Sequence, residues 1–156
     1  MRIPRLFGVV ALVMSSLVPA QAQDEKAAVL AVVKQLFDGM RAKDASMVKG
    51  AFHPSAQLFS SSTKEGRPEV AVTTLDAFVA AVTRPRPEVN DERTRNEVVQ
   101  IDGAFAAVWA DYAFYRGTTF SHCGVDAFHL AKDAGGWKIV ALGDTRRTEG
   151  CDAWPK

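Results

Sequence analysis

Two aspartates, Asp111 and Asp126, have the side-chain type and the placement that proton transfer requires. Each lies in a run of alternating apolar residues that predicts a β-strand, and tight turns between the runs place both side chains on one face of neighbouring strands. Burial of such a pair raises the pKa of one acid, so that the two can divide the acid and base roles. The alternative is that either aspartate caps a turn or lies in water at the end of the sheet.

His122 is either a proton shuttle beside these acids or a hydrogen-bonded structural group. The other two histidines, His53 and His129, do not combine with it into a metal-binding pattern, because none are spaced as a helical pair and strand alternation places His122 and His129 on opposite faces. The sequence has no Gly-rich phosphate loop, dinucleotide fingerprint or nucleophile elbow. We therefore expect neither a metal site nor a cofactor.

The expected hairpin registers divide the sheet into two faces. Turn signals at 102–103, 116–119 and 133–136 set these registers, and the face that carries Asp111, Asp126 and His122 also carries aromatic residues. Acids and aromatic groups together are typical of a small-molecule pocket, so we expect this face to be concave. Its candidate ligand-binding residues are Asn96, Trp109, Tyr115 and Phe128.

The opposite face carries a continuous apolar strip along one strand. We expect this strip to be covered by a second copy of the chain, which would give an isologous homodimer. The strip consists of Val108, Ala110, Tyr112 and Phe114.

The first residues have the three-part pattern of a secretory signal peptide. Arg2 and Arg5 precede an apolar run over 6–14, and small residues end at Ala22, where we expect cleavage. The expected mature chain, residues 23–156, has 17 basic and 18 acidic residues, because 2 of the 19 basic residues leave with the signal. This balance favours neither nucleic acid nor an anionic membrane as a partner. We expect a periplasmic or secreted protein without a membrane anchor.

Export places Cys123 and Cys151 in an oxidising compartment, where two cysteines commonly form a disulfide. Two free thiols are the alternative. A nucleophilic thiol would require an activating base that the spacing does not identify.

The elements that must position these residues follow from periodicity. Helical spacing over 24–43 predicts a long amphipathic helix, and two shorter helices follow at 44–52 and from Thr74 to about Val82, with Asp44 and Thr74 as N-caps. A strand at 57–62 and a short extended return at 69–72 are expected between the second and third helices. After the third helix, period-two patterns predict an antiparallel meander of four strands, at 94–101, 105–116, 120–131 and 137–146.

This order of elements resembles the nuclear transport factor 2-like (NTF2-like, SnoaL-like) superfamily. The stretches 122–124, 136–140 and 144–147 further resemble its lumazine-binding branch. The resemblance implies an α+β cone over most of the mature chain, in which N-terminal helices pack on a curved antiparallel sheet. It also implies a small-molecule-binding domain, with a lumazine-like heterocycle as the ligand. The alternatives are an isomerase or cyclase-like enzyme that uses the pocket carboxylates, and a non-catalytic dimeric interaction domain.

Overall fold

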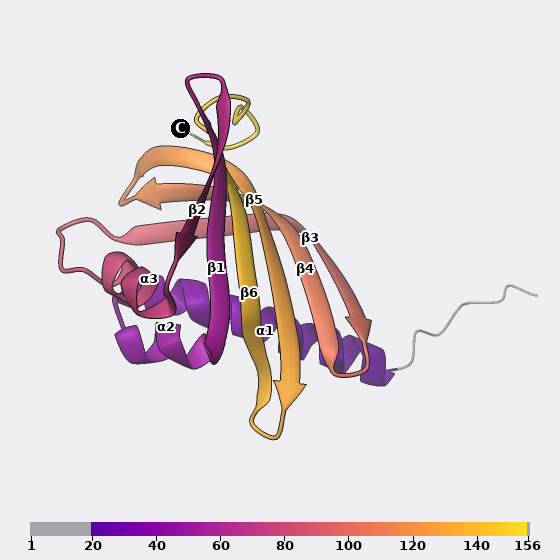
Figure 1. Cartoon of the computed structure of the whole chain (residues 1–156). Coiled ribbons are helices and arrows are strands. Elements are labelled where there is room, and N and C mark those ends of the chain that lie inside the picture. Colours follow the sequence, from indigo (N-terminus) through magenta and orange to yellow (C-terminus); the bar gives the residue numbers. More distant parts are fainter. Residues whose placement is uncertain (1–19, 156) are drawn as a thin grey trace, which may run out of the picture.

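The computed structural model describes residues 20–155, and Figure 1 shows three helices on the concave side of one curved sheet. The expected signal peptide falls mostly outside the described residues, and its last residues, from Ala20, begin the first helix. In chain order the elements are α1 (Ala20–Ala42), α2 (Ala45–Ala51), β1 (Phe52–Lys64), β2 (Arg67–Thr73), α3 (Leu75–Val82), β3 (Asn90–Asp102), β4 (Phe105–Arg116), β5 (Thr119–Asp133) and β6 (Gly136–Arg146).

The six strands have the order β2-β1-β6-β5-β4-β3. All neighbours are antiparallel except β1 and β6, which are parallel and which close the meander onto the first hairpin. Strand β1 begins five residues earlier than the sequence predicted, and Pro54 lies inside it. Proline is tolerated there because the pairing with β6 is irregular between Phe52 and Gln57.

The two predicted N-caps are confirmed. A side-chain oxygen of Asp44 accepts a hydrogen bond from the backbone N–H of Met47, and Thr74 accepts one from Ala77 in the same way. The apolar stripe of α1 is also confirmed, because it is buried against the concave face of the sheet. Phe37 of this helix meets the ring of Phe128 edge to face, with 6.2 Å between the ring centroids.

Three bulges decide which residues face the helices. In β5 the pairing changes at Ser121, because Tyr115 lies opposite Phe120 whereas Phe114 lies opposite His122. Strand β6 has a similar shift near Val140, and β3 has one between Arg95 and Val98. Each extra residue moves all later side chains of its strand to the other face relative to the neighbouring strand.

The bulge at Ser121 overturns the expected face of β4. Asp126 lies opposite Ala110, so Asp126 shares its face with the even-numbered residues of β4 and not with Trp109 or Asp111. The apolar strip that we expected on the outer face therefore points inward, where it contributes to the core and to the cavity described below. This strip consists of Val108, Ala110, Tyr112 and Phe114.

None of the helices in the described part of the chain has the length and apolar character needed to cross a membrane.

Candidate functional site

A cavity of about 340 Å³ lies between the concave face of the sheet and the helices α1 and α3. Apolar side chains of the helices, among them Leu36, Phe37 and Phe78, form one wall. The sheet supplies the polar wall, which consists of Ser60, Asn90, Glu92, Tyr112, Arg116, His122, Asp126, Asp144 and Arg146. The cavity therefore combines an apolar side with several titratable groups, which is the composition of a small-molecule site.

Asp126 is the most deeply buried acid of this wall, with 2% of its surface exposed. Burial raises its pKa well above the usual range, and the neighbouring carboxyl of Glu92 raises it further through charge repulsion and a hydrogen bond. The surroundings therefore favour the protonated form of Asp126 over the carboxylate. Its Oδ2 atom is buried and receives no hydrogen bond from any group in residues 20–155.

Glu92 lies on β3 and forms a carboxyl–carboxylate pair with Asp126. Burial raises the pKa of Glu92 to about 7, while the hydrogen bond from Asp126 and the charges of Arg146 and Arg41 oppose the rise. Arg41 of α1 also holds this part of β3 in place, because its guanidinium donates to the Glu92 carbonyl oxygen at 3.2 Å. The two carboxyl groups therefore titrate as a pair, and burial favours keeping a proton on the pair.

A third acid, Asp144 of β6, lies directly opposite Asp126. Burial raises its pKa, and the hydroxyl of Ser60, which donates a hydrogen bond to it, limits the rise. The Tyr112 hydroxyl lies 3.4 Å from Asp144 and donates to the carbonyl oxygen of Thr145 at 3.0 Å. The pKa of Tyr112 is raised by burial and by the nearby acids, so this hydroxyl stays protonated.

His122 lies in the same cavity, stacked on Phe114 with 5.0 Å between ring centroids. Burial and the positive charges of Arg146 and Arg116 lower its pKa to about 4. The imidazole is therefore neutral at physiological pH. A neutral ring can donate a hydrogen bond from one nitrogen and accept one at the other.

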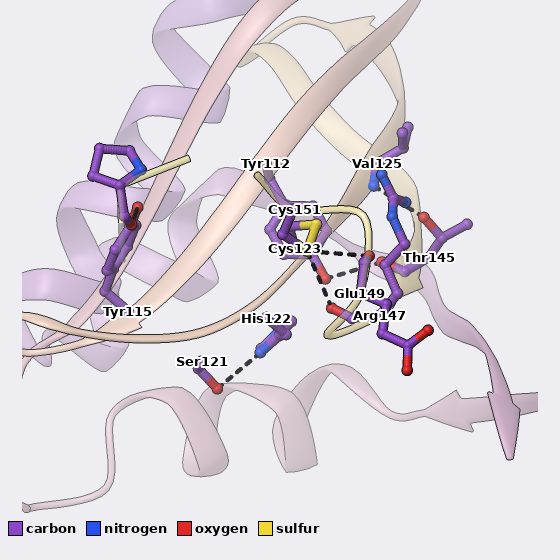
Figure 2. The surroundings of a disulfide bond; sticks show 11 residues. Tyr112, Tyr115, Ser121, His122, Cys123, Val125, Thr145, Arg147, Glu149 and Cys151 are labelled. Atoms are coloured by element: carbon purple, nitrogen blue, oxygen red, sulfur yellow. Dashed lines mark hydrogen bonds between the residues drawn. A yellow bond between two sulfur atoms is a disulfide. The ribbon is translucent and has the colours of Figure 1, made fainter. Parts of the chain in front are cut away.

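A disulfide holds the strand segment that carries His122. Figure 2 shows Cys151, in the tail after β6, against Cys123, and the two sulfur atoms are bonded. The tail pairs with β5 through Arg147, whose backbone exchanges hydrogen bonds of 2.9 and 3.0 Å with Cys123. Because adjacent strand residues point to opposite faces, Cys123 anchors the tail outside the sheet while His122 points into the cavity.

Gly124 follows Cys123 on β5 and allows β5 to pack closely against Tyr112 of β4 and Thr145 of β6. A Cβ atom at this position would lie 1.8 Å from the carbonyl oxygen of Thr145 and 2.6 Å from the ring of Tyr112. Both approaches are impossible for a side chain, so only glycine allows the Tyr112 hydroxyl to reach Thr145 across β5.

The sequence-predicted site residues fall into two groups. Asp126 and His122 line the cavity, and Phe128 lies on the same face but is packed in the core. The other four lie on the outer face. Trp109 is 56% exposed there, Asp111 accepts a hydrogen bond from Asn96 at 2.8 Å, and the Tyr115 hydroxyl donates to Pro155 of the tail. The expected pairing of Asp111 with Asp126 is therefore wrong, because the bulge at Ser121 separates them.

Most polar residues of the cavity were not among the predicted site residues, and the three that contact or face Asp126 most closely are Glu92, Tyr112 and Asp144. Glu92 precedes the expected start of its strand, so no face was assigned to it. Tyr112 was assigned to the outer face. Asp144 was noted only within the stretch 144–147 that carries the family resemblance. The register of the last hairpin could have identified Asp144, because a single bulge in that hairpin brings Asp144 directly opposite Asp126.

Residues 24–142 match the protein family described as "Putative lumazine-binding". This match covers most of the chain. The chain belongs to this family. No curated protein matches the chain at a significant level.

Solved structures with the same fold are numerous, and their sequences differ widely from this family member. A protein of unknown function from Mycobacterium tuberculosis has a TM-score of 0.69 and 16% identity over 88% of this chain and 81% of its own. An NTF2-like protein of unknown function from Shewanella baltica has a TM-score of 0.62 and 17% identity over 81% and 97% of the two chains. A "putative ketosteroid isomerase" from Shewanella frigidimarina has a TM-score of 0.56 and 18% identity over 77% and 96%. At such identities the likeness establishes the NTF2-like fold alone.

Proposed function

We propose that the cavity binds a small planar heterocycle of the lumazine class. The observation that carries this proposal is a pair of buried oxygen atoms, Oδ2 of Asp126 and Oδ1 of Asn90, which belong to residues that line the cavity and have no hydrogen-bond partner within residues 20–155. Buried acceptors without donors are costly in a folded protein, and a bound molecule with N–H groups would satisfy both. A pteridine dione such as lumazine has these donors on a flat ring system.

The size and the apolar wall support the same ligand class. A cavity of about 340 Å³ is at the lower end of the range for small-molecule sites, so it suits one or two fused rings. Phe37 and Phe78 would contact the faces of such rings, while the sheet would contact their polar edges.

The test is a titration of the mature chain with lumazine, in which binding is monitored by calorimetry or by the fluorescence of the ligand. We expect saturable binding that Asp126→Ala weakens about tenfold or more, because a hydrogen bond to a buried carboxyl is lost. Asp111→Ala is the matched control, since Asp111 lies on the outer face of the neighbouring strand. Absence of lumazine binding at millimolar concentration contradicts the proposal. Unfolding curves establish that both variants are folded, and an equal loss of lumazine affinity in the two folded variants also contradicts it.

A second candidate function is proton transfer next to a carbonyl group, and the raised pKa values of Asp126 and Glu92 favour it. A base is most effective when its pKa is near the working pH, which is the case for Glu92. In such a reaction the Glu92 carboxylate would remove a proton from the carbon beside the carbonyl and return it to another carbon. Protonated Asp126 would donate its hydrogen bond to the carbonyl oxygen in place of Glu92, as the raised pKa of this acid permits.

The corresponding assay follows the isomerisation of a β,γ-unsaturated cyclic ketone to its conjugated isomer by ultraviolet absorbance. Glu92→Gln should abolish turnover and retain ligand binding. The matched control Glu97→Gln, on the same strand but outside the cavity, should leave turnover unchanged. Turnover that is absent from the wild type, or that survives in Glu92→Gln, excludes this second function without affecting the first.

We also propose that the chain is exported and works outside the cytoplasm. The disulfide between Cys123 and Cys151 supports this proposal, since such bonds persist in oxidising compartments. N-terminal sequencing of the secreted or periplasmic protein should begin at Gln23, and a retained Met1 would contradict it.

A further inference from the structure

Three arginines line the same cavity as the acids. Arg86 comes from the segment between α3 and β3, Arg116 from the end of β4, and Arg146 from the end of β6. Arg116 and Arg146 are exposed and Arg86 is half-buried, so the three lie at the open side of the cavity. Three separate segments thus bring guanidinium groups to one opening.

None of these three guanidinium groups forms an ion pair with any group in residues 20–155. Arg86 has only a long hydrogen bond of 3.4 Å to a backbone carbonyl, and Arg146 lies 3.3 Å from the neutral ring of His122. The charge of Arg146 also acts through space on Glu92 and Asp144, without a contact. By contrast, Arg41 and Arg93 are paired with carboxylates.

The strand registers separate the arginines of the cavity from its acids by about the width of one aromatic ring. Asp144 lies opposite Asp126, and Arg146 follows two residues later on β6, which is about 7 Å along the strand. Arg116 lies opposite Asn90 at the start of β3, beyond the level of His122. The cavity therefore has a buried acid, Asp126, at its floor and unpaired positive charge at its opening.

We infer that the natural ligand carries an anionic oxygen group, a carboxylate or a phosphate, on the side of the ring system away from Asp126. The inference rests on the proposed binding function and names the ligand class more closely. The guanidinium groups of Arg116 and Arg146 hold the anion, because their planar donor pairs match the oxygen atoms of either group. The neutral, hydrogen-bonding part of the ligand meets Asp126.

The experiment compares lumazine with a lumazine derivative that carries a carboxylate on the pyrazine ring. The carboxylate should bind about tenfold more tightly at low salt, which is what two partly exposed ion pairs contribute. Half-molar sodium chloride should reduce this gain, since salt screens exposed charges. In the double variant Arg116→Gln/Arg146→Gln the two compounds should bind equally well, and lumazine itself should bind as in the wild type.

Arg147→Gln is the matched control. It removes the same charge one residue away, but Arg147 does not line the cavity, so the preference for the carboxylate should persist. His122 supplies a second readout by nuclear magnetic resonance. Burial lowers the pKa of His122, and the charges of Arg146 and Arg116 lower it further. A bound anion offsets these two charges, so the pKa of His122 should be higher with the carboxylate bound than with lumazine bound.

The outcomes separate the two proposals. If lumazine binds and the carboxylate binds no more tightly, or if the preference survives in the double variant, the anion inference is wrong and the heterocycle proposal stands. If neither compound binds, both proposals are wrong. If only the carboxylate binds, and the double variant abolishes its binding, the anion inference is supported and the neutral-heterocycle proposal is not.

Discussion

Replacing Glu92 with glutamine should make the protein more stable above neutral pH. The pKa of Glu92 is about 7 in the folded chain and 4.5 for an ordinary glutamate. A carboxyl whose pKa is higher in the folded state binds its proton more tightly there, so protonation stabilises the fold below pH 4.5. That stability is lost as the pH rises through about 7. The difference between the two pKa values corresponds to about 3 kcal/mol.

The wild type should therefore lose about 3 kcal/mol of unfolding free energy between pH 4.5 and pH 8 through this one group. Glutamine resembles the protonated acid in shape and charge, so Glu92→Gln should equal the wild type at pH 4.5 and exceed it at pH 8. Urea unfolding at a series of pH values measures both curves. The variant Glu97→Gln should follow the wild type. Parallel curves for Glu92→Gln and the wild type would refute the burial of a titrating carboxyl at this position.

Three further predictions concern the framework of the site. The double variant Cys123→Ser/Cys151→Ser should lose about 3 kcal/mol, because the disulfide closes a loop of 28 residues, and unchanged urea unfolding would contradict this. Gly124→Ala should cost about 3 kcal/mol or more, since its Cβ would overlap the carbonyl oxygen of Thr145, and a thermal midpoint equal to that of the wild type would show otherwise. The homodimer remains a prediction, and it now rests on the exposed outer face around Trp109. Light scattering should give a dimer, and Trp109→Ser should convert it to monomers. A monomeric wild type would count against the prediction.

The sequence predicted each helix and strand of the fold, although β1 and β3 begin earlier than expected. Period-two patterns located β4 with both of its ends, and helical periodicity located the buried stripe of α1. These features are set by residues only a few positions apart in the sequence, so the pattern of apolar residues is enough to predict them. The N-caps Asp44 and Thr74 belong to the same class, because each bonds a backbone group three residues away.

The site was only partly predictable because it depends on registers. A hairpin turn fixes the pairing next to the turn, and the turn between β4 and β5 was predicted correctly at Arg116 and Thr119. The bulge at Ser121 comes two residues later and has no turn residue to mark it. Curvature of the sheet requires such an extra residue, but several positions can accommodate it at a similar energy. One unmarked residue was therefore enough to exchange Asp111 for Tyr112 in the cavity.

The bulge also explains why Asp126 lies beside two other acids, at a position where burying a carboxyl group destabilises the fold. With an unbroken register, Asp126 would share its face with Trp109 and Asp111. The extra residue instead turns Asp126 under α1, beside Glu92 and opposite Asp144. An apolar residue in place of Asp126 would avoid the cost of burying a carboxyl group, and Glu92 and Asp144 are half-buried beside it. Folding alone therefore gives no reason for three acids on one wall of the cavity. A ligand with hydrogen-bond donors gives one, and the arginines at the opening of the cavity fit the other end of the same molecule.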